Sequence, residues 1–344
     1  MPPFSKLSDV VESVRLVPLE TLDDVLLGNI RRTFIGKEYM IIQSYSGNID
    51  FHLFSIDGKY IRKLGKNGTG PGEYSRVQSI SVLEDEKLIF IQDINGRPVI
   101  SYSFSGEVDK TIHLPSSSLF FTMLNKNTYA YTAAPPSDYE LKIINQKDSD
   151  TMNFLPIVGE NYTCEPQFYG SFHDRIFYSG IGRDTLFKVD KNGIEPVLAF
   201  DFGDGHLSGK TAFLPMMQHP AGKISLPLGV IQCGDFYQVT LQHTQNQAPP
   251  ELYTAYISRQ KQELRLMDIF DNPDDVIFCN AFPFREVSSN EELVTSVFPL
   301  ELIEALPQIT ENKNFKYSEQ MIDQIKNLKE DNNPVIVLFK LKKL

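Results

Sequence analysis

The sequence lacks the features that usually announce a membrane, metal or disulfide-rich protein. None of its 344 residues lie in an apolar run of about 18 or more, so we expect no transmembrane helix. Only three cysteines occur, Cys164, Cys233 and Cys279. They are far apart and odd in number, which fits neither a zinc-binding spacing nor a dense disulfide framework. We interpret them as buried, small hydrophobic side chains.

An excess of positive charge is also missing. Lysine and arginine number 33 against 44 aspartates and glutamates, which gives a formal net charge of −11. An acidic surface repels phosphate backbones, so we expect no nucleic-acid partner. The opening residues Met1-Pro2-Pro3-Phe4 lack the charged and apolar regions of a signal peptide. We therefore expect a native leader to be absent from this chain, and a lipid anchor in the precursor is left open.

Motifs for known chemistry are absent or incomplete. No G-x-S-x-G elbow occurs, and none of the six histidines has metal-ligand spacing. The segment Gly205–Thr211 resembles a phosphate-binding loop, but its glycines are one residue too close together. The acidic segment Asp271–Asp275 lacks the glycine and distal glutamate of an EF-hand loop. We interpret both segments as surface loops.

What the sequence does contain is a repeat. The landmarks Met40-Ile41-Ile42-Gln43, Gly47 and Asp57-Gly58 correspond to Ile89-Phe90-Ile91-Gln92, Gly96 and Ser105-Gly106. The offset is 49 residues at the first two landmarks and 48 at the third. Both copies run from an apolar strand through a polar loop to an alternating strand, a tight turn and another strand. A strand-only repeat of this period predicts a β-propeller with one sheet per blade.

We predict an all-β, six-bladed propeller of four-stranded blades, in a single domain over residues 1–344. The expected blades are approximately 22–65, 77–116, 117–158, 166–205, 223–272, and 275–344 together with 10–20. In the first blade, Asp57-Gly58 predicts a type I′ hairpin turn, because both of its positions favour φ > 0. In the fourth blade, Lys191-Asn192-Gly193 predicts a hairpin turn before an outer strand at Val197–Phe202.

The two ends of the chain predict how the ring closes. Val14–Leu19 forms a strand beside Val335–Leu341, which removes two open sheet edges. Pro18 then fits a position that needs no ladder N–H. Two short helices are expected before the last strand, one over Leu300–Leu306 with Pro299 in its first turn, and one over Ser318–Leu328 with Ser318 as N-cap.

Four parts of the chain carry a recognisable pattern: Phe54–Gly65 with Gly68–Tyr74, Val17–Thr21, Arg183–Val189 and Asn333–Leu341. They resemble a family of six-bladed β-propellers from Gram-negative gut anaerobes. The Gly-Pro-Gly-Glu-Tyr loop is the most specific of these. The family resembles NHL-repeat propellers, is usually exported and is often lipidated, but has no established activity. The resemblance implies a periplasmic or cell-surface protein with a binding role.

Propeller ligands bind at one mouth of the channel, on loops from several blades. The links between blades and the loops joining second to third strands share one face. We therefore predict a ligand-binding site from the polar residues of those loops: Tyr74, Arg76, Asp93, Arg97, Arg183 and Asp184. The glycine-rich loop Gly68–Gly72 is interpreted mainly as structural, because its glycines supply unusual backbone angles.

Two functions fit these observations. The first is a non-catalytic, monomeric propeller of the cell envelope that binds a small molecule, a glycan, a peptide or a protein partner, with no cofactor. The alternative is a metal-dependent hydrolase or lyase resembling six-bladed lactonases, with calcium held in the channel by carboxylates such as Asp93 and Asp184. No full ligand set for calcium is recognisable in the sequence, so we favour binding.

Overall fold

The computed structural model describes most of the chain. The described residues are Ser8 and the ranges 11–94, 98–157, 168–170, 175–180, 183–207, 220–245, 251–260, 264–268, 286–313 and 315–343. Several residues of interest lie outside them, namely Arg97, Cys164, Cys279 and Asp271–Asp275.

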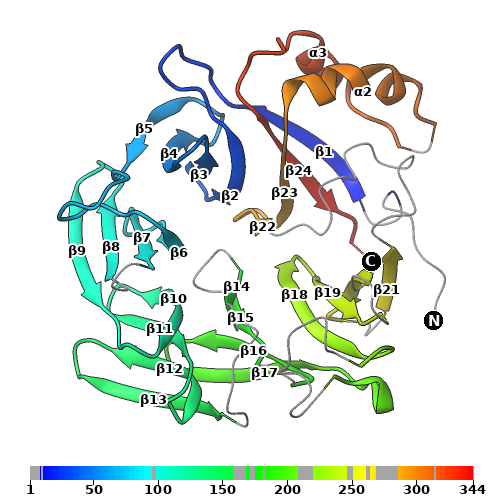
Figure 1. The fold of residues 1–344 in the computed structure, drawn as a ribbon. Helices are drawn as coiled ribbons and strands as arrows, with labels where there is room; N and C mark the ends of the chain where they lie inside the picture. The colour runs from blue at the N-terminus through cyan, green and yellow to red at the C-terminus, as the bar shows by residue number, and fades with distance from the viewer. Residues whose placement is uncertain are drawn as a thin grey trace. The chain divides into compact units, whose positions relative to one another are not determined.

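The strands form six four-stranded sheets, the blades of a six-bladed β-propeller (Figure 1). The first two blades are β2 (Asn29–Ile35), β3 (Tyr39–Tyr45), β4 (Ile49–Ser55) and β5 (Tyr60–Leu64), and then β6 (Val77–Leu83), β7 (Leu88–Asp93), β8 (Pro98–Ser103) and β9 (Val108–His113). The third and fourth are β10 (Ser118–Asn125), β11 (Thr128–Ala133), β12 (Tyr139–Asn145) and β13 (Asp150–Pro156), and then β14 (Phe168–Tyr169), β15 (Ile176–Tyr178), β16 (Thr185–Asp190) and β17 (Gly193–Ala199). The fifth is β18 (Ile224–Cys233), β19 (Phe236–His243), β20 (Glu251–Ser258) and β21 (Leu264–Asp268), and the sixth, in the order of its neighbours, is β1 (Val11–Pro18), β24 (Val335–Leu341), β23 (Glu292–Val297) and β22 (Glu286–Val287). Each sheet falls within its predicted blade range.

The chain divides into two compact units, residues 1–64, 231–239 and 253–344, and residues 65–230 and 240–252. In the first unit, β1 pairs with β24 in antiparallel register from Val14↔Phe339 to Pro18↔Val335. The predicted pairing of the chain ends is confirmed, although β1 begins at Val11 rather than Val14. The expected helices are also present, as α2 (Pro299–Glu311) and α3 (Glu319–Lys326).

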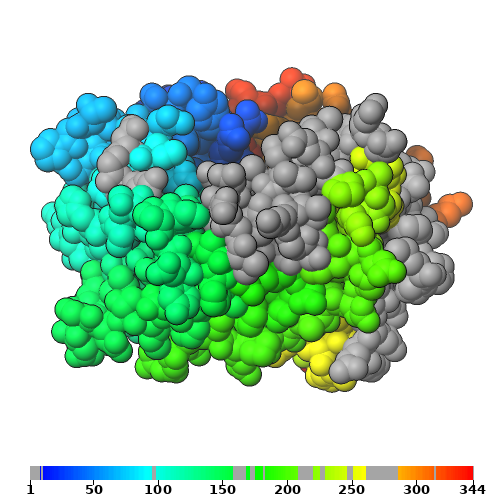
Figure 2. Space-filling view, turned by 60° about the horizontal axis from the view of Figure 1, so that its bottom comes forward, coloured from blue at the N-terminus to red at the C-terminus, as the bar shows by residue number. Residues whose placement is uncertain are grey.

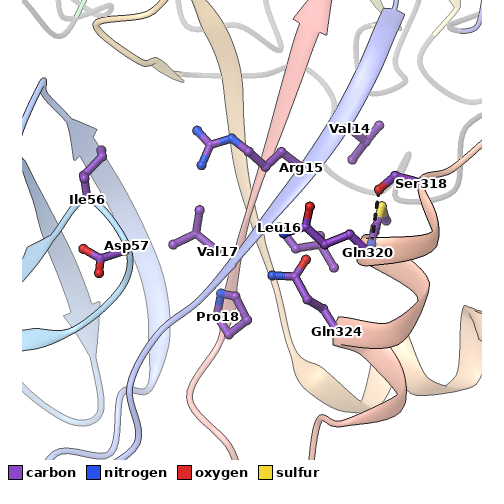
Figure 3. A pocket seen from close by; sticks show the side chains of 11 residues that line it. Val14, Arg15, Leu16, Val17, Pro18, Ile56, Asp57, Ser318, Gln320 and Gln324 are labelled. Carbon is purple, nitrogen blue, oxygen red and sulfur yellow. Dashed lines mark hydrogen bonds between the residues drawn. The ribbon is translucent and has the colours of Figure 1, made fainter.

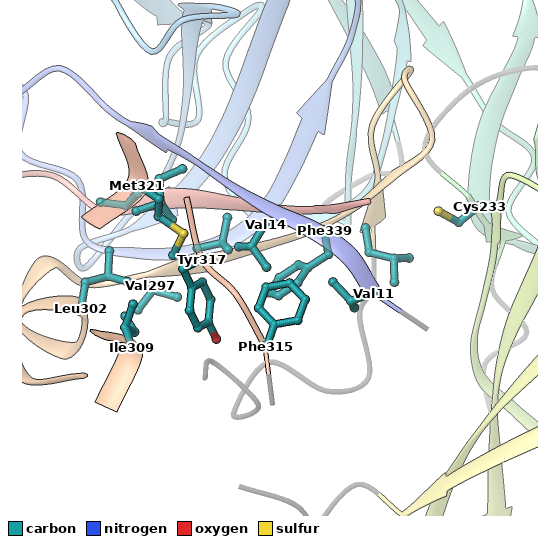
Figure 4. Close-up of a cluster of buried hydrophobic side chains, with 14 of the residues drawn as sticks. Val11, Val14, Cys233, Val297, Leu302, Ile309, Phe315, Tyr317, Met321 and Phe339 are labelled. Atoms are coloured by element: carbon teal, nitrogen blue, oxygen red, sulfur yellow. The ribbon is translucent and has the colours of Figure 1, made fainter. Parts of the chain in front are cut away.

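Helices α2 and α3 pack on one face of this closing sheet (Figure 4). Leu302, Ile309 and Met321 from the helical segment pack in one core cluster with Val14 and Phe339 from the strands. Ser318 caps α3 as predicted, because its hydroxyl accepts a hydrogen bond from the Met321 N–H at 3.2 Å. Helix α2 is longer than predicted and contains Pro307. Beyond that proline, Ile309 is buried and extends the apolar face of the helix.

In the second unit, hydroxyl groups join the inner strands β6 and β10. The Ser79 hydroxyl accepts from the Phe121 N–H at 3.2 Å, and the Ser81 hydroxyl accepts from the Met123 N–H at 3.0 Å. Blades three and four, in green, form a continuous surface in Figure 2.

Strand β17 corrects one expectation, since it begins at Gly193, directly after the turn, and ends at Ala199 instead of Phe202.

The Asp57-Gly58 turn is a second correction. Gly58 has φ +88° as predicted, but Asp57 does not have a positive φ, so the turn is not type I′. The Gly58 N–H donates to the Ser55 carbonyl at 3.0 Å, and the Ser55 N–H donates to the Lys59 carbonyl at 2.8 Å. These bonds define a three-residue loop that ends in a left-handed residue. The second blade repeats the pattern at Ser103, Gly106 and Glu107.

Candidate functional site

The glycine-rich loop between β5 and β6 is held by its own residues. The Gly68 N–H donates to the Tyr74 carbonyl at 2.8 Å, and the Tyr74 N–H donates to the Lys66 carbonyl at 3.1 Å. The Tyr74 side chain is fully buried, with its ring edge-on to Tyr102 at a centroid distance of 6.2 Å. In this structure Tyr74 therefore anchors the loop from beneath.

Tyr102 secures the same loop from the neighbouring strand. Its hydroxyl donates to the Gly72 carbonyl at 2.7 Å. Burial raises the pKa of Tyr102 to about 12, so the hydroxyl keeps its proton at neutral pH and remains a donor. The loop is thus attached to β8 by a bond that does not titrate in the physiological range.

Glu73 closes the loop at its outer side. One carboxylate oxygen accepts from the Gly70 N–H at 2.9 Å, and the other lies 2.6 Å from the Lys66 ammonium. The hydrogen bond from Lys66 holds the pKa of Glu73 below its usual range. A Cβ at Gly68 would overlap this carboxylate, so glycine there permits the close approach that a larger residue would force Glu73 to give up.

Asp93 joins the end of β7 to the same loop. Its Oδ2 accepts from the Ser75 N–H, from the Ser75 hydroxyl at 3.0 Å and from the Arg76 N–H at 3.3 Å. The Ile94 N–H also donates to the Arg76 carbonyl at 2.9 Å. Asp93 is only 4% exposed, whereas Arg76 is exposed. The structure therefore brings together Tyr74, Arg76 and Asp93 of the predicted site.

A cavity of about 290 Å³ lies against this loop. Its lining combines loop backbone, hydroxyls, two carboxylates and three apolar side chains: Gly68, Thr69, Gly70, Pro71, Gly72, Glu73, Ser75, Asp93, Pro98, Ile100 and Thr111. The glycine-rich loop, which the sequence suggested to be mainly structural, is thus one wall of a cavity as well.

Arg183 belongs to a second group, where blade three meets blade four. Its guanidinium donates to a Glu140 carboxylate oxygen at 3.2 Å and to the Pro156 carbonyl at 2.9 Å. The Tyr178 hydroxyl donates to the other Glu140 oxygen at 3.0 Å. Asp184 is exposed and accepts from the neighbouring Thr185 hydroxyl at 2.9 Å.

Glu140 is the residue that sequence reasoning missed. Its side chain is fully buried, whereas that of Arg183 is 27% exposed. Burial raises the pKa of Glu140, while the Arg183 charge and the two hydrogen bonds oppose that rise. The available signal was a carboxylate at the start of the apolar strand Tyr139–Asn145, where a charge needs a partner.

The pH dependence of stability should reveal this buried carboxyl. A raised folded-state pKa means that its contribution to stability is complete below the ordinary value of 4.5 and is lost as the pH rises through the folded value. Glu140→Gln cannot ionise. We therefore expect the unfolding free energy of the variant, relative to the parent, to improve between pH 4.5 and pH 7.5. Urea denaturation of both proteins at the two pH values tests this, and a relative stability that is constant or falls would contradict it.

Other features carry less chemistry. Within the described ranges, no three histidine, cysteine, aspartate or glutamate side chains are placed to share a metal ion. Cys233 is buried, as expected of a hydrophobic cysteine, and lies beside the Glu291 carbonyl. His52 is buried in β4, and burial lowers its pKa to about 4. Among the described helices, none is long and apolar enough to cross a membrane.

Six four-stranded sheets with polar loops define a protein of the six-bladed β-propeller class. Residues 3–340 match one family model throughout, and the chain belongs to that family, a domain of unknown function designated DUF4934. No curated protein matches the chain.

Two solved structures share the fold over nearly all of both chains. A Bacteroides fragilis protein described as exported is 16% identical, covers 98% of this chain and 97% of its own, and superposes with a TM-score of 0.68. A DUF4221 family member from Bacteroides vulgatus is 13% identical, covers 97% and 98%, and gives a TM-score of 0.58. Identities this low establish the fold alone.

Proposed function

We propose that this protein is a non-catalytic binding propeller of the bacterial cell envelope and that it holds a neutral glycan at the glycine-rich loop. The observation that carries the proposal is the 290 Å³ cavity beside Gly68–Gly72. An exported setting is supported by the fold shared with the exported Bacteroides fragilis protein. Of the other predicted residues, Arg76 follows this loop and stays in the proposed binding surface, whereas Arg183 and Asp184 belong to the second group and Arg97 lies outside the described residues.

The lining suits a polyhydroxylated ligand. Thr69, Ser75 and Thr111 carry hydroxyls that can both donate and accept, and the partly exposed Glu73 carboxylate can accept from sugar hydroxyls. Pro98 and Ile100 offer an apolar surface for the C–H face of a sugar ring. A few polar groups against apolar walls are typical of small-molecule sites.

The loop is also organised before any ligand arrives. Glu73, Asp93 and Tyr102 hold its backbone through the hydrogen bonds given above. A rigid site loses little conformational entropy on binding, which favours affinity. Because Asp93 Oδ2 already accepts three loop donors, its carboxylate is engaged in building the loop rather than poised as a base.

A glycan array probed with the purified protein tests this proposal. Thr111→Trp should fill the cavity and weaken binding of the selected glycan at least tenfold, about 1.4 kcal/mol. His113→Trp is the matched control, because it changes another exposed residue of β9 that does not line the cavity. We expect the control to bind like the parent protein.

Two outcomes would contradict the proposal. One is an array with no bound glycan, and the other is equal binding by Thr111→Trp and the parent protein. Lactone hydrolysis that depends on added calcium would instead support the metal-dependent alternative.

A further inference from the structure

Strand β1 is the edge strand of its sheet, and half of its backbone groups point away from that sheet. The Leu19 N–H donates to the Pro334 carbonyl, and the register continues without a shift through Val17↔Ile336 and Arg15↔Leu338. In an antiparallel ladder, hydrogen-bonded residues alternate with residues whose N–H and C=O groups point away from the paired strand. In β1, the residues that point away from β24 are Val14, Leu16 and Pro18.

Pro18 confirms this assignment, because it stands where no ladder N–H is needed. Its outward carbonyl is approached by Gly58 of the β4–β5 turn, since a Cβ built on Gly58 would overlap that oxygen. The N–H and C=O groups of Val14 and Leu16 are therefore the open part of the edge, in the sense that no described strand pairs with them; the two residues are 8% and 3% exposed.

This edge differs from the outer strands of the first four blades. Strands β5, β9, β13 and β17 are mostly exposed or half-buried along their length. Bulges interrupt the pairing of β5, β9 and β17, a common way to make an edge unsuitable for further pairing. In β1, four of eight residues are buried, and the bulge lies at Val11/Ser13, before the open part.

A groove of about 360 Å³ runs along this open edge. Residues Val14–Pro18 form its floor, Ser318, Gln320, Met321 and Gln324 of the α3 segment form one wall, and Ile56 and Asp57 of the β4–β5 turn form the other. Figure 3 shows β1 running between the helix and the turn, with Gln320 and Gln324 on one side and Asp57 on the other. A hydrogen bond from Ser55 lowers the pKa of Asp57, which keeps this wall negatively charged at neutral pH. The groove floor also carries a cation, Arg15, which is paired with Glu292 at 3.1 Å.

We propose that this groove binds an extended peptide that adds a strand to β1 and carries a basic residue opposite Asp57. Backbone pairing with Val14 and Leu16 would provide up to four hydrogen bonds, as in other cases of strand addition. Alternate peptide side chains would face the Gln320 and Gln324 amides on one side and Asp57 on the other. The net charge of −11 also favours a basic peptide.

A second copy of this chain fits the groove less well. The edge of β1 lies below two walls, and an equally recessed edge from another copy would meet those walls before the strands could pair. A single extended segment has no such obstruction. The groove shares no lining residue with the cavity at the glycine-rich loop, and the inference does not depend on the proposed glycan function.

Amide hydrogen exchange tests the premise in the free protein. We expect Arg15 and Val17 amides to be protected by β24, and Val14 and Leu16 amides to exchange at least tenfold faster. Equal protection of all four amides would mean that the edge is already paired and would overturn the proposal.

Selection from a randomised library of eight-residue peptides with capped ends tests the binding. We expect enriched peptides with alternating β-branched residues and a lysine or arginine at one position, and slower exchange of the Val14 and Leu16 amides when they bind. Gln324→Trp fills the groove and should weaken binding at least tenfold, whereas Asp323→Trp, on the exposed side of α3, should not.

A separate pair of variants tests the basic residue that the peptide is proposed to place opposite Asp57. Asp57→Lys should weaken the selected peptides at least tenfold. Glu107→Lys makes the same charge change beside Gly106, in the equivalent turn of the second blade, and should leave binding unchanged. Failure to enrich any peptide, binding that ignores Gln324→Trp and Asp57→Lys, or a dimer that buries β1 would each overturn the proposal.

Discussion

Replacing Gly58 with alanine should destabilise the protein by about 2–5 kcal/mol, because strain and overlap act together. Gly58 has φ +88°, a backbone conformation that residues with a Cβ rarely adopt. The added Cβ would also overlap the carbonyl oxygen of Pro18, which is backbone and cannot rotate away. The Glu20 N–H donates to the Gly58 carbonyl at 2.8 Å, so the turn cannot retreat without breaking this bond.

Gly47→Ala is the matched control. Gly47 has nearly the same φ, +91°, but nothing lies within 4 Å of a Cβ built there. Its substitution should therefore cost only the backbone term, about 1–2 kcal/mol. Urea denaturation followed by circular dichroism measures both variants. If Gly47→Ala and Gly58→Ala lose the same free energy of unfolding, the contact with Pro18 is not tight.

The first two blades could be predicted because their signals are local. In both, apolar strands of similar length and a turn with Asp-Gly or Ser-Gly recur at an offset of 48 or 49 residues. The turn type could not be predicted in this way, because Asp57-Gly58 can form a two-residue loop or end a three-residue loop. The second arrangement occurs, with the Ile56 N–H donating to the Glu38 carbonyl at 3.0 Å. Glu38 directly precedes β3, the strand that pairs with β4, and this pairing cannot be read from the local sequence of the turn.

The candidate site shows the same limit. The position of Asp93 at the end of a strand predicted that it would lie near the loop preceding its blade. Nothing in the sequence indicated that its carboxylate would accept three loop donors. Glu140 was missed because its partners Tyr178 and Arg183 are 38 and 43 residues away. Roles that depend on such distant pairs emerge only when the sheets are placed side by side.

Asn333 is the residue through which the closing strand holds the start of the first blade. Its Oδ1 accepts from the Leu27 N–H at 2.8 Å, and its Nδ2 donates to the Glu20 and Val25 carbonyls, each at 2.8 Å. Its own N–H donates to the Thr21 hydroxyl at 2.8 Å. The residue is 2% exposed. One acceptor and two donors are required there, which an asparagine amide supplies and an aspartate does not.

Asn333→Asp should therefore destabilise the protein by about 3–5 kcal/mol at neutral pH, because it buries a charge that faces two carbonyl oxygens. Burial raises the pKa of the new carboxyl, and a protonated carboxyl can donate one hydrogen bond. The loss of stability should consequently be smaller at pH 5 than at pH 8.

Asn332→Asp is the control: its Oδ1 accepts from the Lys329 N–H at 2.9 Å, a bond that a carboxylate retains. The control should change stability by no more than about 0.5 kcal/mol. The chain has no tryptophan, so circular dichroism or tyrosine fluorescence would follow urea unfolding. Equal stability of the two variants, or a deficit in Asn333→Asp that shrinks as the pH rises, would show that the amide does not hold the two segments together.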